Sequence, residues 1–267
     1  MHLLSLAEQS VAILALYNHN VWDIHEQKVL SPLPCANPMH GHPRALGMTL
    51  PHAIGTIEIA DRIGILKSHP KVKVIDATTG KCQWVPFPFI GDLLLFLEDD
   101  AGPYLVNWNV KDRPVSFRRR LSRYGKPVQD IDDAGAIARH KLENDYYLSA
   151  GIRTVQLASI EIDFHVRCNL RELFTAQAAL TRLSRDIETE AEAIFNESVG
   201  RPQVAAAVVL SVMTRLKIAR EAALAVLKRA VWHRRIMVDL FTPFLMDRPL
   251  QPQTRDVLDV YSEWFRR

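Results

Sequence analysis

The sequence lacks the features that mark disulfide-stabilised, secreted and membrane-spanning proteins. Its only cysteines are Cys35, Cys82 and Cys168, which are odd in number and too far apart to suggest a disulfide framework or a zinc site. No apolar run approaches the roughly 18 residues that a membrane span needs. The first residues have neither the basic region nor the cleavage signature of a secretion signal. We therefore expect a protein of a reducing cytoplasm that has no membrane partner.

The sequence also has little net charge, only +3, but that charge is unevenly distributed. Segments 111–126 and 215–235 each contain seven bases and one acid. Basic clusters attract phosphate backbones, although a solvated charged face explains such a segment as readily. The DNA-binding candidates in the first segment are Arg113, Arg118, Arg119, Arg120, Arg123 and Lys126. In the second, the candidates for binding DNA or an acidic partner surface are Lys217, Arg220, Lys228, Arg229, Arg234 and Arg235.

The hydrophobic pattern predicts an α/β domain of mixed strands flanked by helices, followed by a mostly helical domain. We place the boundary near residue 165, giving domains 1–165 and 166–267. In the first domain we expect helices over 1–20, 55–66 and 133–150, and strands over 21–25, 71–76, 82–90, 93–97, 103–108 and 153–158. Residues 93–97 are all apolar, so this strand belongs in the sheet centre with both faces covered.

The second domain has the pattern of a winged helix. We expect helices over 169–198 (with a break allowed), 200–216, 220–231 and 254–265, and a small hairpin of strands 236–240 and 244–246. Two helices joined by a short turn and followed by a two-stranded wing are typical of winged-helix domains. We find neither internal repeats nor low-complexity tracts.

The segment from Asp92 to Lys111 is the most informative part of the chain. It contains an apolar stretch, an acidic turn with a glycine at 98–102, and a second apolar stretch. This pattern predicts a β-hairpin whose two ends carry polar residues.

The expected register of this hairpin brings a carboxylate, an amide and an ammonium together. If the turn is centred near Asp100 and Ala101, the ladder puts Asp92 opposite Asn109 and Val110. Asn109 and Lys111 are two residues apart, so their side chains leave the same face. An acid followed by a Xaa-Lys motif is the arrangement of restriction-type nucleases, in which the carboxylate holds a divalent metal and the lysine stabilises developing charge. A salt bridge that pins the hairpin end is the simpler interpretation, and the residues alone leave both open.

A nuclease site needs a further hard oxygen ligand, and the sequence offers several. Glu8 follows Ser5 at the spacing of a capping box, so its carboxylate has a purely local role available. Glu26, Glu58 and Asp61 are rival acids, and spacing does not choose among the four.

Several motifs of the chain share a family pattern. They are Leu3-Leu4-Ser5 followed by Glu8, Val21-Trp22-Asp23-Ile24-His25-Glu26-Gln27, Asp92 opening a strand, Asn109-Val110-Lys111, and Lys141–Tyr147 followed by Gly151-Ile152. Over residues 2–34, 84–112 and 140–163 the chain resembles the TnsA family, the endonuclease subunit of heteromeric transposon transposases. The resemblance is lost between residues 35 and 83, where this chain is longer.

This resemblance implies a restriction-endonuclease-like fold and a Mg²⁺-dependent DNA endonuclease. The implied catalytic residues are Glu8, Asp92, Asn109 and Lys111, and the implied ligands of one or two Mg²⁺ ions are Glu8, Asp92 and the carbonyl of Val110. Lys111 would orient water for attack on a phosphodiester, and Asn109 would position a phosphate or a water.

The resemblance also implies a function and partners. The enzyme would cut the non-transferred (5′) strand at transposon ends during cut-and-paste transposition in the bacterial cytoplasm. Its partners would be transposon-end DNA, a DDE-type (TnsB-like) transposase and an AAA+ (TnsC-like) regulator. The alternatives are a stand-alone restriction-like endonuclease and a non-catalytic assembly subunit.

The chain departs from the family pattern at three positions. Gly91 precedes Asp92 where many restriction-like nucleases have proline, Asn109 replaces a glutamine, and almost no sequence precedes the segment that carries Glu8. None of these changes removes Glu8, Asp92 or Lys111, so we expect an active enzyme.

Overall fold

The computed structural model describes residues 5–119, 132–178 and 183–267, and the chain divides into two compact units. Unit 1 is formed by Met1–Val11, His19–Glu161 and Trp264–Arg267, and unit 2 by Ala12–Asn18 and Ile162–Glu263. The main division therefore falls after Glu161. Helix α1 (Leu6–Tyr17) contributes residues to both units.

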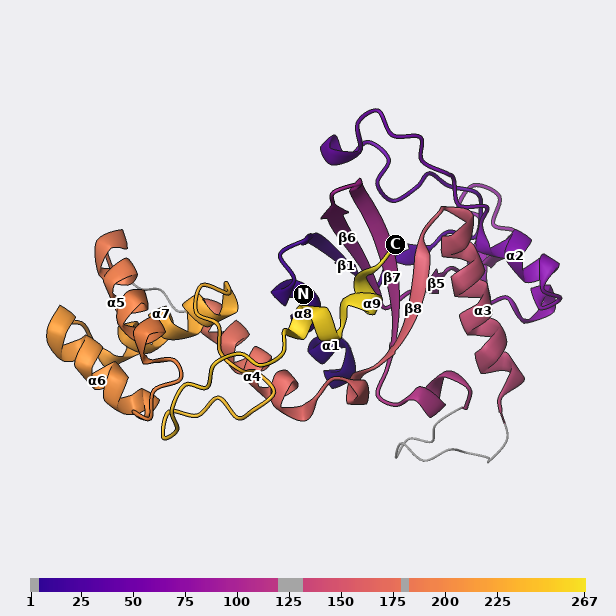
Figure 1. Cartoon of the computed structure of the whole chain (residues 1–267). Coiled ribbons are helices and arrows are strands. Elements are labelled where there is room, and N and C mark those ends of the chain that lie inside the picture. The colour runs from indigo at the N-terminus through magenta and orange to yellow at the C-terminus, as the bar shows by residue number, and fades with distance from the viewer. Residues whose placement is uncertain (1–4, 120–131, 179–182) are drawn as a thin grey trace. The chain divides into compact units, whose positions relative to one another are not determined.

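Unit 1 is built on a mixed four-stranded sheet (Figure 1). Its strand order is β1 (Val21–Glu26), β6 (Leu93–Asp99), β7 (Gly102–Lys111) and β8 (Arg153–Ala158). The first two pairings are antiparallel and β7 pairs with β8 in parallel. Residues Leu93–Leu97 of β6 are all buried, which confirms the expectation of an interior strand covered on both faces.

The turn between β6 and β7 sets the register of the whole hairpin. Asp99 pairs with Gly102, and Leu93 pairs with Trp108. The Asp99 carboxylate accepts a hydrogen bond from the Ala101 N–H at 2.9 Å, and Gly102 has φ of 105°, which favours glycine. Continuing this register by one residue sets Asp92 beside Asn109, as the sequence predicts.

Helix α3 (Ala134–Ser149) covers the sheet face that carries Asp92 and Asn109. It begins where the Asp133 side chain accepts hydrogen bonds from the N–H groups of Gly135 and Ala136, and it ends before Gly151, which has φ of 71°. Figure 1 shows α3 alongside β8. The buried core on this face joins residues of β6, β7, α3 and α2 (Thr56–Arg62), among them Leu94, Phe96, Leu105, Ile59 and Leu142. Apolar packing therefore holds α3 against the hairpin.

Two small two-stranded sheets complete the described strands of unit 1. Strand β2 (Val29–Leu30) pairs with β5 (Phe89–Ile90), and β3 (Lys71–Ile75) pairs with β4 (Cys82–Pro86). The single strand expected over 82–90 is therefore two strands. Strand β4 ends at Pro86, which pairs with Lys71, and Phe87 and Pro88 separate it from β5. Short 3₁₀ turns lie at Pro43–Ala45, Leu66–Ser68, Pro114–Phe117 and Ser159–Glu161.

Unit 2 is helical in the part that the structure describes. Its elements are α4 (Phe164–Thr175), the 3₁₀ turn Ala176–Ala178, α5 (Arg185–Ser198), α6 (Ala205–Leu216), α7 (Arg220–Trp232) and α8 (Val257–Val260), and α9 (Ser262–Phe265) leads back to unit 1. The long helix expected over 169–198 is thus broken. Helix α6 begins later than expected, and the closing helix expected over 254–265 is two short ones.

The expected wing is wrong. Segments 236–240 and 244–246 do not pair with each other; instead Val238 forms an isolated bridge with Pro252. The side chain of Asn169 takes the place of a strand partner. Its amide nitrogen donates to the carbonyls of Leu240 and Thr242, and its oxygen accepts from the Phe244 N–H. These polar groups of the loop are satisfied without a ladder.

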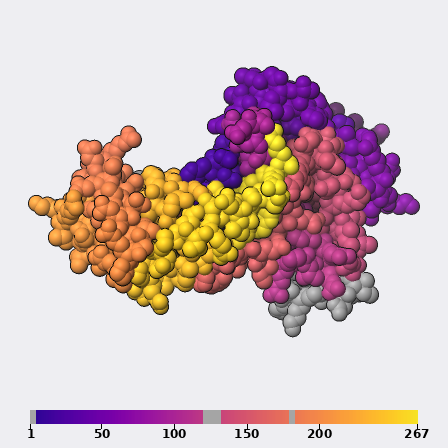
Figure 2. All heavy atoms as spheres, in the orientation of Figure 1, coloured from indigo at the N-terminus to yellow at the C-terminus, as the bar shows by residue number. Residues whose placement is uncertain are grey.

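The last residues of the chain lie on the sheet of unit 1. The Tyr104 hydroxyl donates to the Phe265 carbonyl, the Trp108 indole N–H donates to the Trp264 carbonyl, and Arg267 pairs with Asp99. Figure 2 shows the end of the yellow segment against the surface of this unit. Among the described residues, no helix is long and apolar enough to cross a membrane.

Candidate functional site

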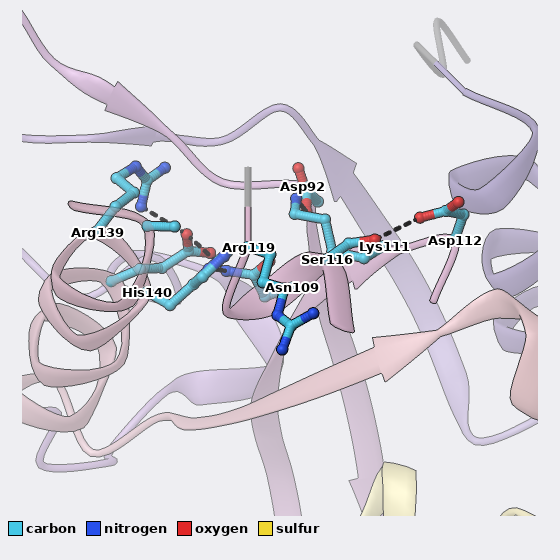
Figure 3. A pocket seen from close by; sticks show the side chains of 10 residues that line it. Asp92, Asn109, Lys111, Asp112, Ser116, Arg119, Arg139 and His140 are labelled. Carbon is cyan, nitrogen blue, oxygen red and sulfur yellow. Dashed lines mark hydrogen bonds and ion pairs between the residues drawn. The ribbon is translucent and has the colours of Figure 1, made fainter. Parts of the chain in front are cut away.

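A cavity of about 380 Å³ lies at the open end of the β6–β7 hairpin, between the hairpin and helix α3 (Figure 3). Carboxylates and cations share its walls. It is lined by Asp92, Asn109, Lys111, Asp112, Ser116, Arg119, Ala136, Arg139, His140 and Glu143. The three hairpin residues singled out from the sequence as catalytic are therefore brought together in one place.

The Lys111 ammonium lies between two oxygen atoms at the hairpin end. Its Nζ donates a hydrogen bond to the Val110 carbonyl at 3.0 Å and lies 3.7 Å from Asp92 Oδ2. The same Asp92 oxygen accepts a hydrogen bond from the Val110 N–H at 2.7 Å. The cross-strand contact thus fixes the carboxylate, and the cation occupies a position where two hard oxygen acceptors converge.

Asn109 is turned toward helix α3 and is only 2% exposed. Its amide nitrogen donates to Glu143 Oε2 at 3.1 Å and lies 2.9 Å from His140 Nδ1. Its Oδ1 atom is buried and has no hydrogen-bond partner among the described residues. Asn109 was expected to position a phosphate or a water, but its amide nitrogen is already engaged with α3.

Glu143 is an acid of the cavity that the sequence analysis missed. Its side chain is 2% exposed; Oε1 accepts a hydrogen bond from Asn107 at 3.0 Å, and Oε2 also accepts one from Arg139 at 2.8 Å. Burial raises the pKa of Glu143, and the Arg139 guanidinium opposes this rise. Gly91 belongs to the same arrangement, because a Cβ atom there would meet Glu143 Oε1 at 3.3 Å. The available signal was Lys141–Tyr147, where the resemblance to the last nuclease helix lies.

His140 is a second residue that the sequence analysis missed. Burial, helped by the nearby charges of Lys111 and Arg139, lowers the pKa of His140 to about 4. The imidazole is therefore neutral near pH 7. With Nδ1 accepting from Asn109, the proton is assigned to Nε2. The ring also makes an edge contact with Phe117, with ring centroids 5.3 Å apart.

Glu8 lies in a capping box rather than among the residues that line this cavity. Ser5 Oγ donates to Glu8 Oε1 at 3.0 Å and accepts from the Glu8 N–H at 3.1 Å. Of the rival acids, Glu58 pairs with Arg62 on α2, and Glu26 is the strand residue that pairs with Leu93. Among the described residues, the carboxylates that line the cavity with Asp92 are Asp112 and Glu143.

The first basic segment is only partly described. Arg118 and Arg119 both pair with Asp132, at 2.6 and 3.7 Å, and Arg119 also lines the cavity. Arg113 is exposed. The candidates Arg120, Arg123 and Lys126 lie outside the described residues.

The second basic segment is mostly engaged inside unit 2. Lys228 pairs with Glu172, Arg229 with Glu188, Arg234 with Asp256 and Arg235 with Glu192. Lys217 is the left-handed residue that ends α6, and Arg220 lines a small apolar cavity with residues of α6 and α7. Four of the six candidates therefore join elements of this unit by ion pairs, which favours a structural role for them.

Among residues 5–119, 132–178 and 183–267, no three His, Cys, Asp or Glu side chains are grouped so that they could hold one metal ion. Comparison with protein-family models and with curated proteins found no match to this chain.

Proposed function

We propose that the chain is a Mg²⁺-dependent DNA endonuclease with a restriction-endonuclease-like unit 1. The observation that supports this proposal most strongly is the position of the Lys111 ammonium, 3.0 Å from the Val110 carbonyl and 3.7 Å from Asp92 Oδ2. An acid, a backbone carbonyl and a lysine at the end of a hairpin form a constellation suited to metal-assisted phosphodiester hydrolysis.

The donor set fits a hard divalent cation. Mg²⁺ prefers oxygen ligands and usually takes one or two carboxylates, with waters and substrate phosphates completing its shell. Asp92 Oδ2 and the Val110 carbonyl would hold it, because both already face one cation, and the moderate exposure of Asp92, 26%, leaves room for the shell. Such an ion supplies charge neutralisation at the scissile phosphate. Glu8, in its capping box, is not needed for this arrangement.

The other residues of the cavity have separate roles in the proposed reaction. Lys111 carries a positive charge on a side chain that is 33% exposed, so it is able to reach a phosphate oxygen or orient a water. Neutral His140 presents Nε2–H and is suited to donate a hydrogen bond. Arg139, Asn107 and Asn109 bind the Glu143 carboxylate and so fix the α3 wall of the site.

By the resemblance of the chain to the TnsA family, the substrate is the 5′ strand at transposon ends, in a bacterial cytoplasm. The partners would be a DDE-type transposase that cuts the other strand and an AAA+ regulator. Unit 2 then serves as a docking module built on the α6–turn–α7 pair rather than as a winged helix, since the wing strands do not form.

Strand-specific cleavage of end-labelled transposon DNA tests this function. The purified chain is incubated with Mg²⁺, alone and with its cognate transposase, beside the Asp92→Ala variant. We expect cleavage of the 5′ strand that needs both Mg²⁺ and Asp92. Cleavage by the chain alone would favour a stand-alone nuclease. Undiminished cutting by Asp92→Ala, with the transposase present, would show a non-catalytic assembly subunit instead.

A further inference from the structure

The β3–β4 hairpin of unit 1 is exposed along almost its whole length. All five residues of β3 are exposed, and so are four of the five residues of β4. The apolar side chains Ile75 and Trp84 are 70% and 62% exposed, and Val72 and Val74 are 37% and 40% exposed. An isolated two-stranded hairpin is marginally stable in water. A hairpin that keeps this much apolar surface exposed therefore suggests a partner.

The register gives the hairpin two different faces. Lys73 lies opposite Trp84, and Lys71 lies opposite Pro86, so these residues share one face. Val72 and Val74 lie on the other face, opposite Val85 and Gln83. The Lys73 ammonium lies 5.2 Å from the centre of the Trp84 ring, so charge and aromatic surface are presented together.

The charge of the hairpin is uncompensated. Lys71, Lys73 and Lys81 are exposed, and among the residues that the structure describes none of them pairs with a carboxylate. The single acid of segment 71–86 is Asp76, whose carboxylate accepts hydrogen bonds from the N–H groups of Thr78 and Thr79. This contrasts with unit 2, where most of the basic candidates are bound to carboxylates. A hairpin with three lysines that form no ion pair in the described part of the chain, one of them over an exposed tryptophan, has a surface suited to bind a polyanion.

We propose that the β3–β4 hairpin is a ribbon that binds duplex DNA beside the cleavage site. A two-stranded ribbon fits the major groove of B-DNA, and its lysines are then close to the flanking phosphates. The position along the chain fits as well, since the six residue-to-residue steps from Pro86 to Asp92 span at most about 20 Å, less than the roughly 34 Å of one helical turn of DNA. This inference rests on the proposed nuclease function, because Asp92 defines where the DNA lies.

Fluorescence anisotropy with a labelled duplex tests the proposal. Binding is measured in the full-length Asp92→Ala background, so that cleavage does not enter. We compare Lys71→Ala/Lys73→Ala/Lys81→Ala with the control Arg171→Ala/Arg201→Ala/Arg248→Ala, which removes the same charge from three exposed positions of unit 2. Each phosphate contact contributes about 0.9 to the slope of log K against log salt. We expect the lysine variant to lower the magnitude of that slope by about 2.7. When the salt falls from 1 M to 0.1 M, the affinity of the variant should therefore rise about 500-fold less than the affinity of the parent.

Trp84→Ala supplies a second, independent readout. The loss of an apolar contact releases no counterion, so we expect about tenfold weaker binding with an unchanged salt slope. The proposal is overturned if the lysine variant and its control lose affinity equally, or if the parent chain does not bind the duplex. Full DNA affinity in all the hairpin variants also overturns it, and would indicate a protein partner for this surface. If cleavage depends on Asp92 but the hairpin variants bind DNA normally, only this inference is refuted. If DNA binding depends on the hairpin but cleavage does not depend on Asp92, only the proposed function is refuted.

Discussion

Replacing Glu143 with alanine should destabilise the protein strongly. The change removes both oxygen atoms that accept hydrogen bonds from Asn107, Asn109 and Arg139. The two amide groups are fully buried, at 0% and 2% exposure, so water does not replace the lost acceptors without a rearrangement. Arg139 is 28% exposed and is partly resolvated. The cost therefore comes mainly from the two amides, with a smaller part from the ion pair.

Each buried donor left without an acceptor costs about 1–3 kcal/mol, which gives a total of about 4 kcal/mol for the two amides. This is a large share of the roughly 5–15 kcal/mol by which a domain is usually stable. Urea unfolding followed by circular dichroism measures the loss as a shift of the midpoint.

Asp145→Ala is the matched control, since it lies on the same helix and pairs with Lys141 at the same four-residue spacing. Its side chain is 27% exposed and its partner 57%, so solvent screens the pair. We expect a loss below about 1 kcal/mol. If Glu143→Ala costs no more than Asp145→Ala, the buried network does not hold α3 as described.

Three further changes test the charges of the two units. Burial raises the pKa of Glu143 above 4.5. The contribution of Glu143 to stability is therefore largest below that value and is lost as the pH rises through the raised pKa. Glu143→Gln should remove this loss, which urea melts from acidic to neutral pH measure. The pKa of His140 is lowered from 6.5 to about 4, so the contribution of His140 to folding stability is lost as the pH falls through that window. His140→Gln should flatten this decline of stability with falling pH. An NMR titration that finds an unshifted pKa for His140 would contradict the prediction. Arg234→Ala breaks the pair with Asp256. It should lower the free energy of unfolding by about 1–2 kcal/mol, measured by thermal melting, without changing DNA affinity. Loss of DNA binding without loss of stability would instead indicate that Arg234 binds DNA.

The hairpin and its register could be predicted from the sequence for a physical reason. Strand side chains alternate with a period of two, and the acidic Gly-containing turn fixes where the alternation begins, so the position of Asp92 relative to Lys111 followed directly. The 2.7 Å contact between the Val110 N–H and Asp92 Oδ2 confirms this geometry. Local pattern was sufficient there because both partners belong to one hairpin.

The α3 side of the site was not predictable in the same way. Glu143 and His140 reach the cavity from a helix whose rotation is set by packing of residues such as Leu142 against the sheet, and spacing in the sequence carries no information about that rotation. Glu8 illustrates the converse problem, because a capping box and a metal ligand have the same sequence pattern. The wing failed because a buried side chain, Asn169, supplied the hydrogen bonds that alternation suggested a strand would make.

Single-turnover cleavage rates of Asp92→Asn and Lys111→Ala test the central claim most directly. Asp100→Asn, at the other end of the same hairpin, serves as the matched control, since Asp100 lies in the exposed turn. We predict that each site variant cuts labelled transposon-end DNA about 100-fold more slowly or worse. Asp92→Asn removes the carboxylate that would hold the metal ion, and Lys111→Ala removes the cation next to the reacting phosphate. Asp100→Asn should cut at the parental rate. Equal rates for all three variants, with the fold intact, would contradict a nuclease site at Asp92 and Lys111.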